Sequence, residues 1–322
     1  MLEKKGIVFA AIFNETPKQL NTWKEVKNWK SFEGFLWLHL DMTDEASQEW
    51  LQQESGLGEF STTLLLSNDT RPRIVTLKQS LIITLRGINF NPGSDPEDMV
   101  VLHMFVSENK IITLRDQKIK AIEEIILDID NGCSFGNTSE FLIDLTSRMV
   151  GKMGDIISET EEHVDLLEGR VIDETNRSLR IDISDVRRKV IMLRRYLLPQ
   201  RDVFSHLLIE KVSWINDVER NHLRATAEIT AKYIDDLDSI RDRAALVQEE
   251  LSNILSDHMN KMMYQLSIVA TIFLPLSLLT GLLGINVAGI PGSNNEIAFW
   301  IVCGILVILS IAEYWFFRSK RK

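Results

Sequence analysis

Two long apolar runs near the C-terminus constrain this chain more than any other feature of its sequence. The first run covers Met262–Leu283 with Gln265 as its only strongly polar side chain, and the second covers Ile297–Phe317 with Glu313 as its only charge. About 20 apolar residues at ~1.5 Å rise each cross a hydrocarbon core of ~30 Å, and a helix satisfies its own backbone there. A helix in a soluble core rarely stays apolar on every face over such a length. The sequence therefore predicts transmembrane helices over 262–283 and 297–317.

The flanking charges predict the orientation of this hairpin. Residues 284–296 contain no Lys or Arg, whereas Lys261 precedes the first run and the tail 318–322 carries four basic residues. Basic residues are enriched on the cytoplasmic side of membrane spans. We therefore expect both termini to be cytoplasmic and residues 284–296 to form an external loop.

The composition of the remaining chain excludes several classes of protein. A net charge of −10 argues against a nucleic-acid partner and is compatible with attracting cations. Cys133 and Cys303 are too few for a disulfide framework or a thiolate metal cage, which agrees with a reducing cytosol. The apolar run Ile7–Phe13 is too short for a secretory signal. Six dispersed histidines and the lack of a Gly-rich phosphate loop or nucleophile–base pair argue against an enzyme.

Short β-rich and helical runs alternate through residues 1–130 and predict an α/β domain with a mixed or largely antiparallel sheet. Ser107-Glu108-Asn109 is expected to form a hairpin turn. The expected strands are Ile7–Phe13, Phe35–Leu40, Arg73–Leu77, Leu81–Gly87, Met99–Val106 and Lys110–Leu114. The expected helices are Thr16–Lys30, with Trp23 and Val26 inward, Asp44–Gln53, Phe60–Leu66, and Lys118–Ile129, with Ile119, Ile122, Ile126 and Ile129 on one side.

Residues 131–261 are predicted to be helical. Apolar residues recur at helical spacing in Ser139–Val171 and in Ile181–Leu198, which Pro199 is expected to end or kink. One stalk helix is then expected from about residue 202 into the first span. An apolar seam with the coiled-coil spacing of 3.5 predicts either partner copies around an axis or packing against the preceding helices of the same chain. The seam comprises Tyr233, Leu237, Ile240, Ala244, Val247, Leu251, Ile254 and His258.

Acidic residues outnumber basic ones by twelve to six over 202–258. They are either a solvated helix face or, around a symmetry axis, carboxylate rings that concentrate divalent cations. Carboxylate oxygens suit Mg²⁺ and also bind Zn²⁺. The pair Asp257-His258 is a hypothetical metal or proton site near the membrane end. The membrane-proximal acids are Asp235, Asp236, Asp238, Asp242, Glu249, Glu250 and Asp257.

One line of residues along the first span is a candidate pore lining, although each position taken singly also fits a lipid-facing or helix-packing role. An apolar constriction gates by dewetting, and polar groups beyond it hold a hydrated ion. Pro275 removes one backbone hydrogen bond in mid-span and is expected to kink the helix. The line runs through Asn260, Met263, Leu266, Ala270, Leu274, Ser277 and Gly281 and leads to Asn286.

The residues of this region also carry a family resemblance. Thr271–Ser277 (TIFLPLS) running into Thr280–Asn286 (TGLLGIN) resembles the signature of the CorA-type divalent metal ion transporter superfamily. Leu193–Leu197 (LRRYL), followed by Pro199 and Arg201, is similar to that family as well. The resemblance covers the architecture of the whole chain and is most specific in the last 65 residues.

Two further stretches resemble the zinc-transporting branch, the ZntB-like proteins. The magnesium branch usually has Gly-Met-Asn in its outer loop, whereas this chain has Gly284-Ile285-Asn286, followed by Val287 and then by Gly289–Gly292. In the N-terminal domain, Leu85–Asn89, Asn91–Gly93 and Asp95–Val100 are also similar to that branch.

The resemblance implies a homopentameric funnel, made of α+β cytosolic domains with long stalk helices and C-terminal hairpins in a bacterial-type inner membrane. It implies Zn²⁺ as the transported ion, with other divalent ions or proton coupling as further options, and no resident cofactor. Asn286 is then expected to meet the hydrated ion beside Ile285, Gly284 to allow the turn, and Glu249 to lie where the magnesium branch carries an intersubunit carboxylate. The alternatives are a Mg²⁺ channel of the same fold and a membrane-anchored scaffold without transport.

Overall fold

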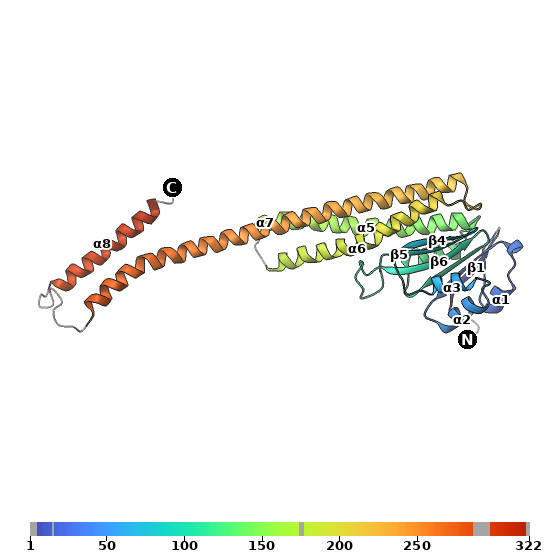
Figure 1. Cartoon of the computed structure of the whole chain (residues 1–322), viewed down its shortest axis with the longest axis horizontal. Helices are drawn as coiled ribbons and strands as arrows, with labels where there is room; N and C mark the ends of the chain where they lie inside the picture. The colour runs from blue at the N-terminus through green and yellow to red at the C-terminus, as the bar shows by residue number, and fades with distance from the viewer. Residues whose placement is uncertain (1–4, 15, 174–176, 286–296, 320–322) are drawn as a thin grey trace. The chain divides into compact units, whose positions relative to one another are not determined.

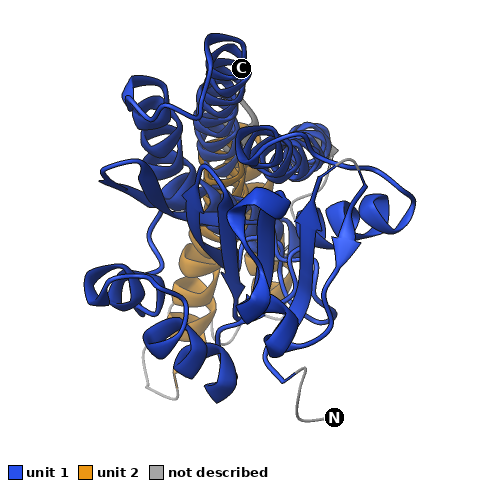
Figure 2. Cartoon of the chain, turned by 90° about the vertical axis from the view of Figure 1, so that its right-hand side faces the viewer, with its two compact units in different colours: residues 1–248 blue, residues 249–322 orange. Residues whose placement is uncertain are grey.

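The structure, a computed structural model, describes residues 5–14, 16–173, 177–285 and 297–319. The chain divides into two compact units, residues 1–248 and 249–322, which Figure 2 shows in blue and orange. The first unit contains a sheet and the helices that cover it. The second unit contains the end of the longest helix and the C-terminal helix α8.

Seven strands form one mixed sheet in the order β2-β1-β3-β7-β6-β5-β4. Strands β3 and β7 are parallel, and every other neighbouring pair is antiparallel. Ser107 pairs with Lys110, which confirms the predicted turn between β6 and β7. The strands are β1 (Ile7–Phe13), β2 (Lys18–Gln19), β3 (Phe35–Asp41), β4 (Arg73–Leu77), β5 (Ser80–Gly87), β6 (Val100–Ser107) and β7 (Lys110–Arg115).

The first predicted helix is wrong in its length. Residues 16–30 contain strand β2 and a helix of six residues, α1, which starts where Thr22 and Glu25 cap each other. This capping box satisfies backbone N–H groups at the true start of the helix. The helices are α1 (Trp23–Asn28), the 3-10 helix η2 (Ser31–Glu33), α2 (Glu45–Gln53), α3 (Glu59–Leu65), α4 (Lys120–Asp130), α5 (Thr138–Asp173), α6 (Arg177–Ile209), α7 (Asp217–Leu283) and α8 (Ala298–Ser319).

The sheet is buried on both faces because its strands alternate side chains between two apolar layers. On β3, Trp37 faces the layer of α4, α5, α6 and the start of α7, whereas Leu36 and Leu38 face the layer of α1, α2 and α3 (Figure 1). The inner side of α4 carries Ile122, Ile125 and Ile129, so Ile125 takes the place that the sequence assigned to Ile126, which is only partly buried.

Helix α6 continues through Pro199 to Ile209, and α7 begins at Asp217, which corrects the stalk start expected near residue 202. Proline removes one helical hydrogen bond, but packing on the sheet outweighs this loss. Leu197 and Gln200 on either side of the proline are fully buried, and the Gln200 Oε1 accepts a hydrogen bond from the Arg86 N–H at 2.7 Å. The break therefore lies in the connection 210–216.

The apolar seam of α7 is buried inside its own chain over Leu237–Val247. Two sets of ion pairs flank it. The Arg194 Nε of α6 lies 2.7 Å from the Asp238 Oδ1 of α7, and the Arg243 Nη2 of α7 lies 2.7 Å from the Glu168 Oε2 of α5. The alternative in which this stretch packs against the preceding helices is thereby confirmed. Before this stretch of the seam, Tyr233 is half-buried. After it, Leu251 is buried, Ile254 is half-buried and His258 is exposed.

Candidate functional site

The candidate pore face occupies one side of the second half of α7. At 100° per residue, all seven positions from Asn260 to Gly281 fall within about 120° of the helix circumference. All seven are exposed, with exposed fractions of 62% for Met263 and 68% for Leu274. The half-buried residues of the same segment lie off this face, namely Ile268, Ile272, Pro275, Leu276 and Leu279. The proposed lining is therefore one continuous surface that the single chain leaves uncovered.

The backbone of this segment remains helical across Pro275. Proline has no N–H, so the carbonyl of Thr271 lacks its usual ladder partner. Two threonine hydroxyls near the proline also donate hydrogen bonds within the helix, Thr271 to the Ser267 carbonyl at 2.8 Å and Thr280 to the Leu276 carbonyl at 2.9 Å. The kink at Pro275 stays a prediction.

Helix α7 ends at Leu283, and Gly284 follows it. The Gly284 N–H donates to the Thr280 carbonyl at 2.9 Å, and a Cβ at this position would lie 3.1 Å from the same oxygen. Glycine therefore avoids a close contact in this turn. Ile285 is half-exposed, at 47%, and Asn286 lies outside the described residues.

The acidic residues of α7 differ in their exposure. Asp238 is half-buried and paired with Arg194 and Arg241, so it is not part of the solvent-facing acidic face that the sequence suggested. Four others are exposed at a spacing of seven residues, which is nearly two helical turns and places them on one face. This acidic face comprises Glu228, Asp235, Asp242 and Glu249. The period was visible in the sequence, but Glu228 was not included in the prediction.

Asp257 and His258 are exposed shortly before the apolar segment begins. Glu249, earlier in α7, is exposed as well. Among the described residues, no three His, Cys, Asp or Glu side chains gather in a geometry that could hold a metal ion.

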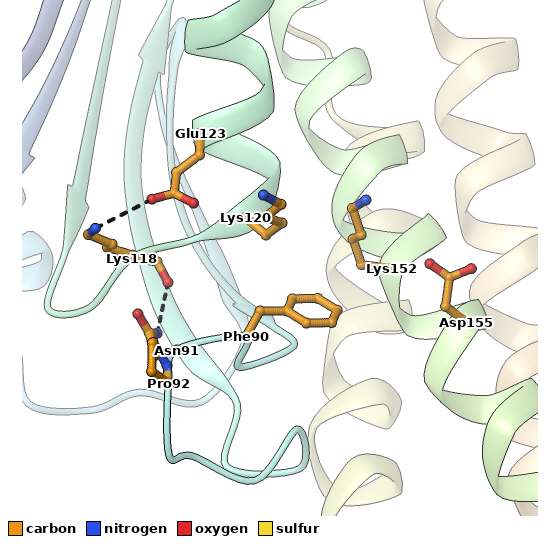
Figure 3. A pocket seen from close by; sticks show the side chains of 8 residues that line it. All are labelled: Phe90, Asn91, Pro92, Lys118, Lys120, Glu123, Lys152 and Asp155. Atoms are coloured by element: carbon orange, nitrogen blue, oxygen red, sulfur yellow. Dashed lines mark hydrogen bonds and ion pairs between the residues drawn. The ribbon is translucent and has the colours of Figure 1, made fainter.

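A hollow of about 360 Å³ lies in the first unit between the loop around Phe90, the start of α4 and the side of α5 (Figure 3). Three lysines line it, but Lys152 lies 2.7 Å from Glu124 and Lys118 lies 4.0 Å from Glu123. These carboxylates offset part of the positive charge of the hollow. The sequence contained no pattern that predicted it.

Helices α7 and α8 each contain a segment long and apolar enough to cross a membrane, and none of either segment is buried inside the protein. A soluble core helix would be mostly covered by its own chain. Exposed apolar surface of this extent marks a membrane or protein interface. Both predicted spans therefore coincide with helices that have no apolar covering in the single chain.

Comparisons with known proteins identify the family. The family profile described as "CorA-like Mg2+ transporter protein" matches residues 32–321. The chain is 36% identical over 288 residues to the divalent cation transporter CmaX of Pseudomonas aeruginosa, covering 89% of this chain and 87% of the relative. It is 33% identical over 290 residues to the zinc transport protein ZntB of Yersinia pseudotuberculosis, covering 88% and 87%.

Solved structures agree with this fold. The full-length CmaX structure matches with a TM-score of 0.85 at 33% identity over 99% of both chains. The complete CorA magnesium transporter of Methanocaldococcus jannaschii matches with a TM-score of 0.82 at 19% identity over 96% of both chains, which shows the shared fold. The extent of these matches shows that this chain belongs to the CorA-like Mg²⁺ transporter protein family, a family of transporters and not of enzymes.

Proposed function

We propose that five copies of this chain surround an axial path through a bacterial-type inner membrane and carry divalent metal ions, Zn²⁺ in particular, along it. The observation that carries this proposal is the uncovered face of α7 from Asn260 to Gly281. A helix that enters the membrane with one continuous unpaired face fits a symmetric bundle. Ala270, Ser277 and Gly281 on this face are small, which leaves room for an ion with its water shell.

The chemistry of the path determines how an ion would cross it. The face carries no charged side chain between Lys261 and Ile285, so complete dehydration of a divalent ion there would be prohibitive. The ion therefore keeps most of its first water shell. Met263, Leu266 and Leu274 form apolar rings that gate by dewetting, and Ser277 lies beyond them. At the external mouth, Asn286 supplies a ring of amides that holds the hydrated ion.

The cytoplasmic approach to the path is acidic. Glu249, Asp257 and His258 are exposed, and rings of such groups raise the local concentration of cations. The imidazole of His258 also offers a group that can exchange protons near neutral pH, which supports proton coupling as part of the proposal. Both termini are placed in the cytoplasm because the basic tail follows the second span.

The choice of Zn²⁺ depends on the loop and on the relatives. The Gly284-Ile285-Asn286 loop is similar to that of the zinc-transporting branch, and a zinc transport protein is among the relatives at 33% identity. Mg²⁺ is the second candidate, because the family description names it and carboxylate and amide oxygens suit it. The described residues contain no thiolate or imidazole cage that would favour one of the two ions.

Reconstituted transport tests the proposal. Purified full-length protein in proteoliposomes should carry Zn²⁺, and Asn286→Ala should abolish this flux while the oligomer remains intact. Asn294→Ala in the same loop is the matched control, and its flux should equal that of the unmodified protein. Undiminished Zn²⁺ flux in the Asn286 variant would reject the role of the amide ring.

The same assay separates the alternatives. Zn²⁺, Mg²⁺, Ni²⁺ and Co²⁺ are offered side by side, each with and without a pH gradient. A flux of Mg²⁺ that greatly exceeds that of Zn²⁺ would identify a Mg²⁺ channel of the same fold. No flux of any of the four ions would identify a membrane-anchored scaffold.

A further inference from the structure

A surface groove on α6 is lined by three arginines. It encloses about 430 Å³, and of the seven residues described along its wall none is acidic. The Arg187 Nη1 donates to the neutral Gln248 Oε1, and Arg188 lies 3.8 Å from Glu97 and 4.0 Å from Asp95 at the limit of ion pairing. The arginine groove comprises Arg180, Ser184, Arg187, Arg188, Ile191, Met192 and Gln248.

The groove also contains exposed apolar surface. The side chain of Ile191 is 56% exposed between the arginines, and Met192 beside it is half-buried. Arginine and methionine around an apolar centre are enriched in protein interfaces relative to other protein surface. The groove therefore has the composition of a docking surface for an acidic partner with a central apolar residue.

Helix α7 presents a surface of this kind on the side away from its buried seam. Asp242 belongs to the acidic face, and Leu246 lies one turn later with 65% of its surface exposed. The same face continues toward Asp235 in one direction and Glu249 in the other. Asp242 contacts Arg241 of its own chain at 2.8 Å, but an exposed pair of this kind contributes only about 0–1 kcal/mol and can exchange partners.

The two surfaces lie at the same height along the helices. Helices α6 and α7 run antiparallel, because Arg187 contacts Gln248 and Arg194 contacts Asp238. The groove residues near Arg187 and Ile191 are therefore level with the α7 segment around Asp242 and Leu246. In a ring whose axis is parallel to α7, neighbouring copies are related by rotation without a shift in height. The groove of one copy then meets the Asp242–Leu246 segment of the next.

We propose that the arginine groove of each copy binds the Asp242–Leu246 face of α7 from the adjacent copy, with the stems of Arg187 and Arg188 level with Leu246, their guanidinium groups extending one turn along the groove to Asp242, and Ile191 packing beside them. This inference rests on the ring in the proposed function and adds the contact that closes it. Because different surfaces meet, the contact is heterologous and generates a cyclic assembly. Two acidic faces placed against each other would repel, so a two-fold pairing through α7 is disfavoured.

Charge reversal tests this contact in the full-length protein. Arg187→Glu and Asp242→Lys should each raise the concentration at which half of the detergent-solubilised oligomer dissociates by about tenfold, the change that 1.4 kcal/mol produces. The double variant should restore the value of the unmodified protein, because the pair is re-formed with its charges exchanged. Lys24→Glu on α1 makes the same change in charge outside the groove and should leave the value unchanged. Unchanged dissociation in both single variants, or no restoration in the double variant, would overturn the proposed pairing.

Cross-linking between differently tagged copies separates this inference from the ring itself. In a background of Cys133→Ser and Cys303→Ala, one copy carries Arg187→Cys and the other carries Leu246→Cys. Oxidation should produce a cross-linked pair with both tags, whereas Arg187→Cys with Leu127→Cys, another exposed leucine, should not. An intact oligomer without the expected cross-link overturns the contact and leaves the ring. A purified protein that is monomeric throughout overturns the ring and the contact together.

Discussion

Gly154 of α5 lies directly against the ring of Tyr233 of α7. A Cβ at position 154 would be 2.7 Å from the Tyr233 Cζ, which is well inside van der Waals contact. Tyr233 packs on the main apolar core, and burial together with the nearby carboxylates of Asp155 and Asp236 raises its pKa. The absence of a side chain on α5 therefore determines how closely α7 can approach that core.

Replacing Gly154 with alanine should destabilise the protein. Overpacking costs ~1–3 kcal/mol, and the helix propensity of alanine offsets ~1 kcal/mol of this, so a net loss of about 1 kcal/mol is expected. The thermal unfolding midpoint in detergent measures it. Gly151→Ala on the same helix is the control, because a Cβ there meets no described atom within 4 Å, and it should raise the midpoint. Equal midpoints for both variants would show that Tyr233 moves without cost.

Removing the ion pair between Arg194 and Asp238 should also lower stability. The two side chains are 34% and 31% exposed, so each charge is partly desolvated and depends on the other. Arg194→Met leaves the Asp238 carboxylate without its α6 partner, and hydrogen bonds to charged groups contribute about 1.5–3 kcal/mol. Arg201→Met, which removes an exposed pair with Asp202, should change the free energy of unfolding by less than about 1 kcal/mol. Similar losses of unfolding free energy in the two variants would contradict the idea that partial burial makes the Arg194–Asp238 pair more important than the exposed one.

Acid should destabilise the sheet of the first unit through two buried histidines. Burial is the main cause that lowers the pKa of His39 to about 3 and that of His103 to about 4, from 6.5 in both cases. Between the unfolded and folded pKa values the unfolded chain binds more protons, so the free energy of unfolding falls as the pH decreases below 6.5. Each histidine lowers the free energy of unfolding by up to about 1.4 kcal/mol for each pH unit below 6.5 within this range.

The measurement is the unfolding midpoint at pH 7.5, 6.5, 5.5 and 4.5. Replacing His39 with Gln, or His103 with Gln, should make the midpoint less dependent on pH between about 6.5 and 4.5, whatever the loss of stability at neutral pH. His163→Gln, an exposed position on α5, is the control. An unchanged pH dependence in both buried-site variants would contradict the assignment.

Adding a bulky side chain at position 281 should obstruct the proposed path without disturbing the fold of the single chain. A Cβ at Gly281, like one at Gly304 of α8, meets no described atom within 4 Å. Gly281→Val should therefore reduce Zn²⁺ flux several-fold in proteoliposomes, because the added side chains would narrow the outer half of the proposed path. Gly304→Val should retain flux. Equal flux in the two variants, with both oligomers intact, would place residue 281 away from the path.

The elements with simple periodicity could be predicted from the sequence. Strands β1 and β4 have the predicted bounds, and the turn before Lys110 follows from a polar triplet between two apolar runs. Both transmembrane segments could be predicted equally well, since a run of about twenty apolar residues is typical of a membrane-spanning helix and of few other structures. These features depend on local spacing and on the solvent that each face meets.

The stalk could not be assigned in the same way. Pro199 predicts a helix end or a kink from local chemistry, yet α6 does not end there, because the packing of buried Leu197 and Gln200 outweighs one lost hydrogen bond. The partner of Asp238 likewise depends on the antiparallel contact with Arg194, 44 residues away in the chain. No local pattern distinguishes it from Asp242, which remains exposed.

The sequence by itself determined the two membrane segments, six of the seven strands and the family, because apolar length, alternation and short motifs are properties of neighbouring residues. Only the tertiary structure decided which face of α7 its own chain covers, since that depends on how α5 and α6 pack beside it. It also assembled the arginine groove from α6 and Gln248. The physical reason is that burial is a property of the surface left after long-range packing, which linear spacing does not encode.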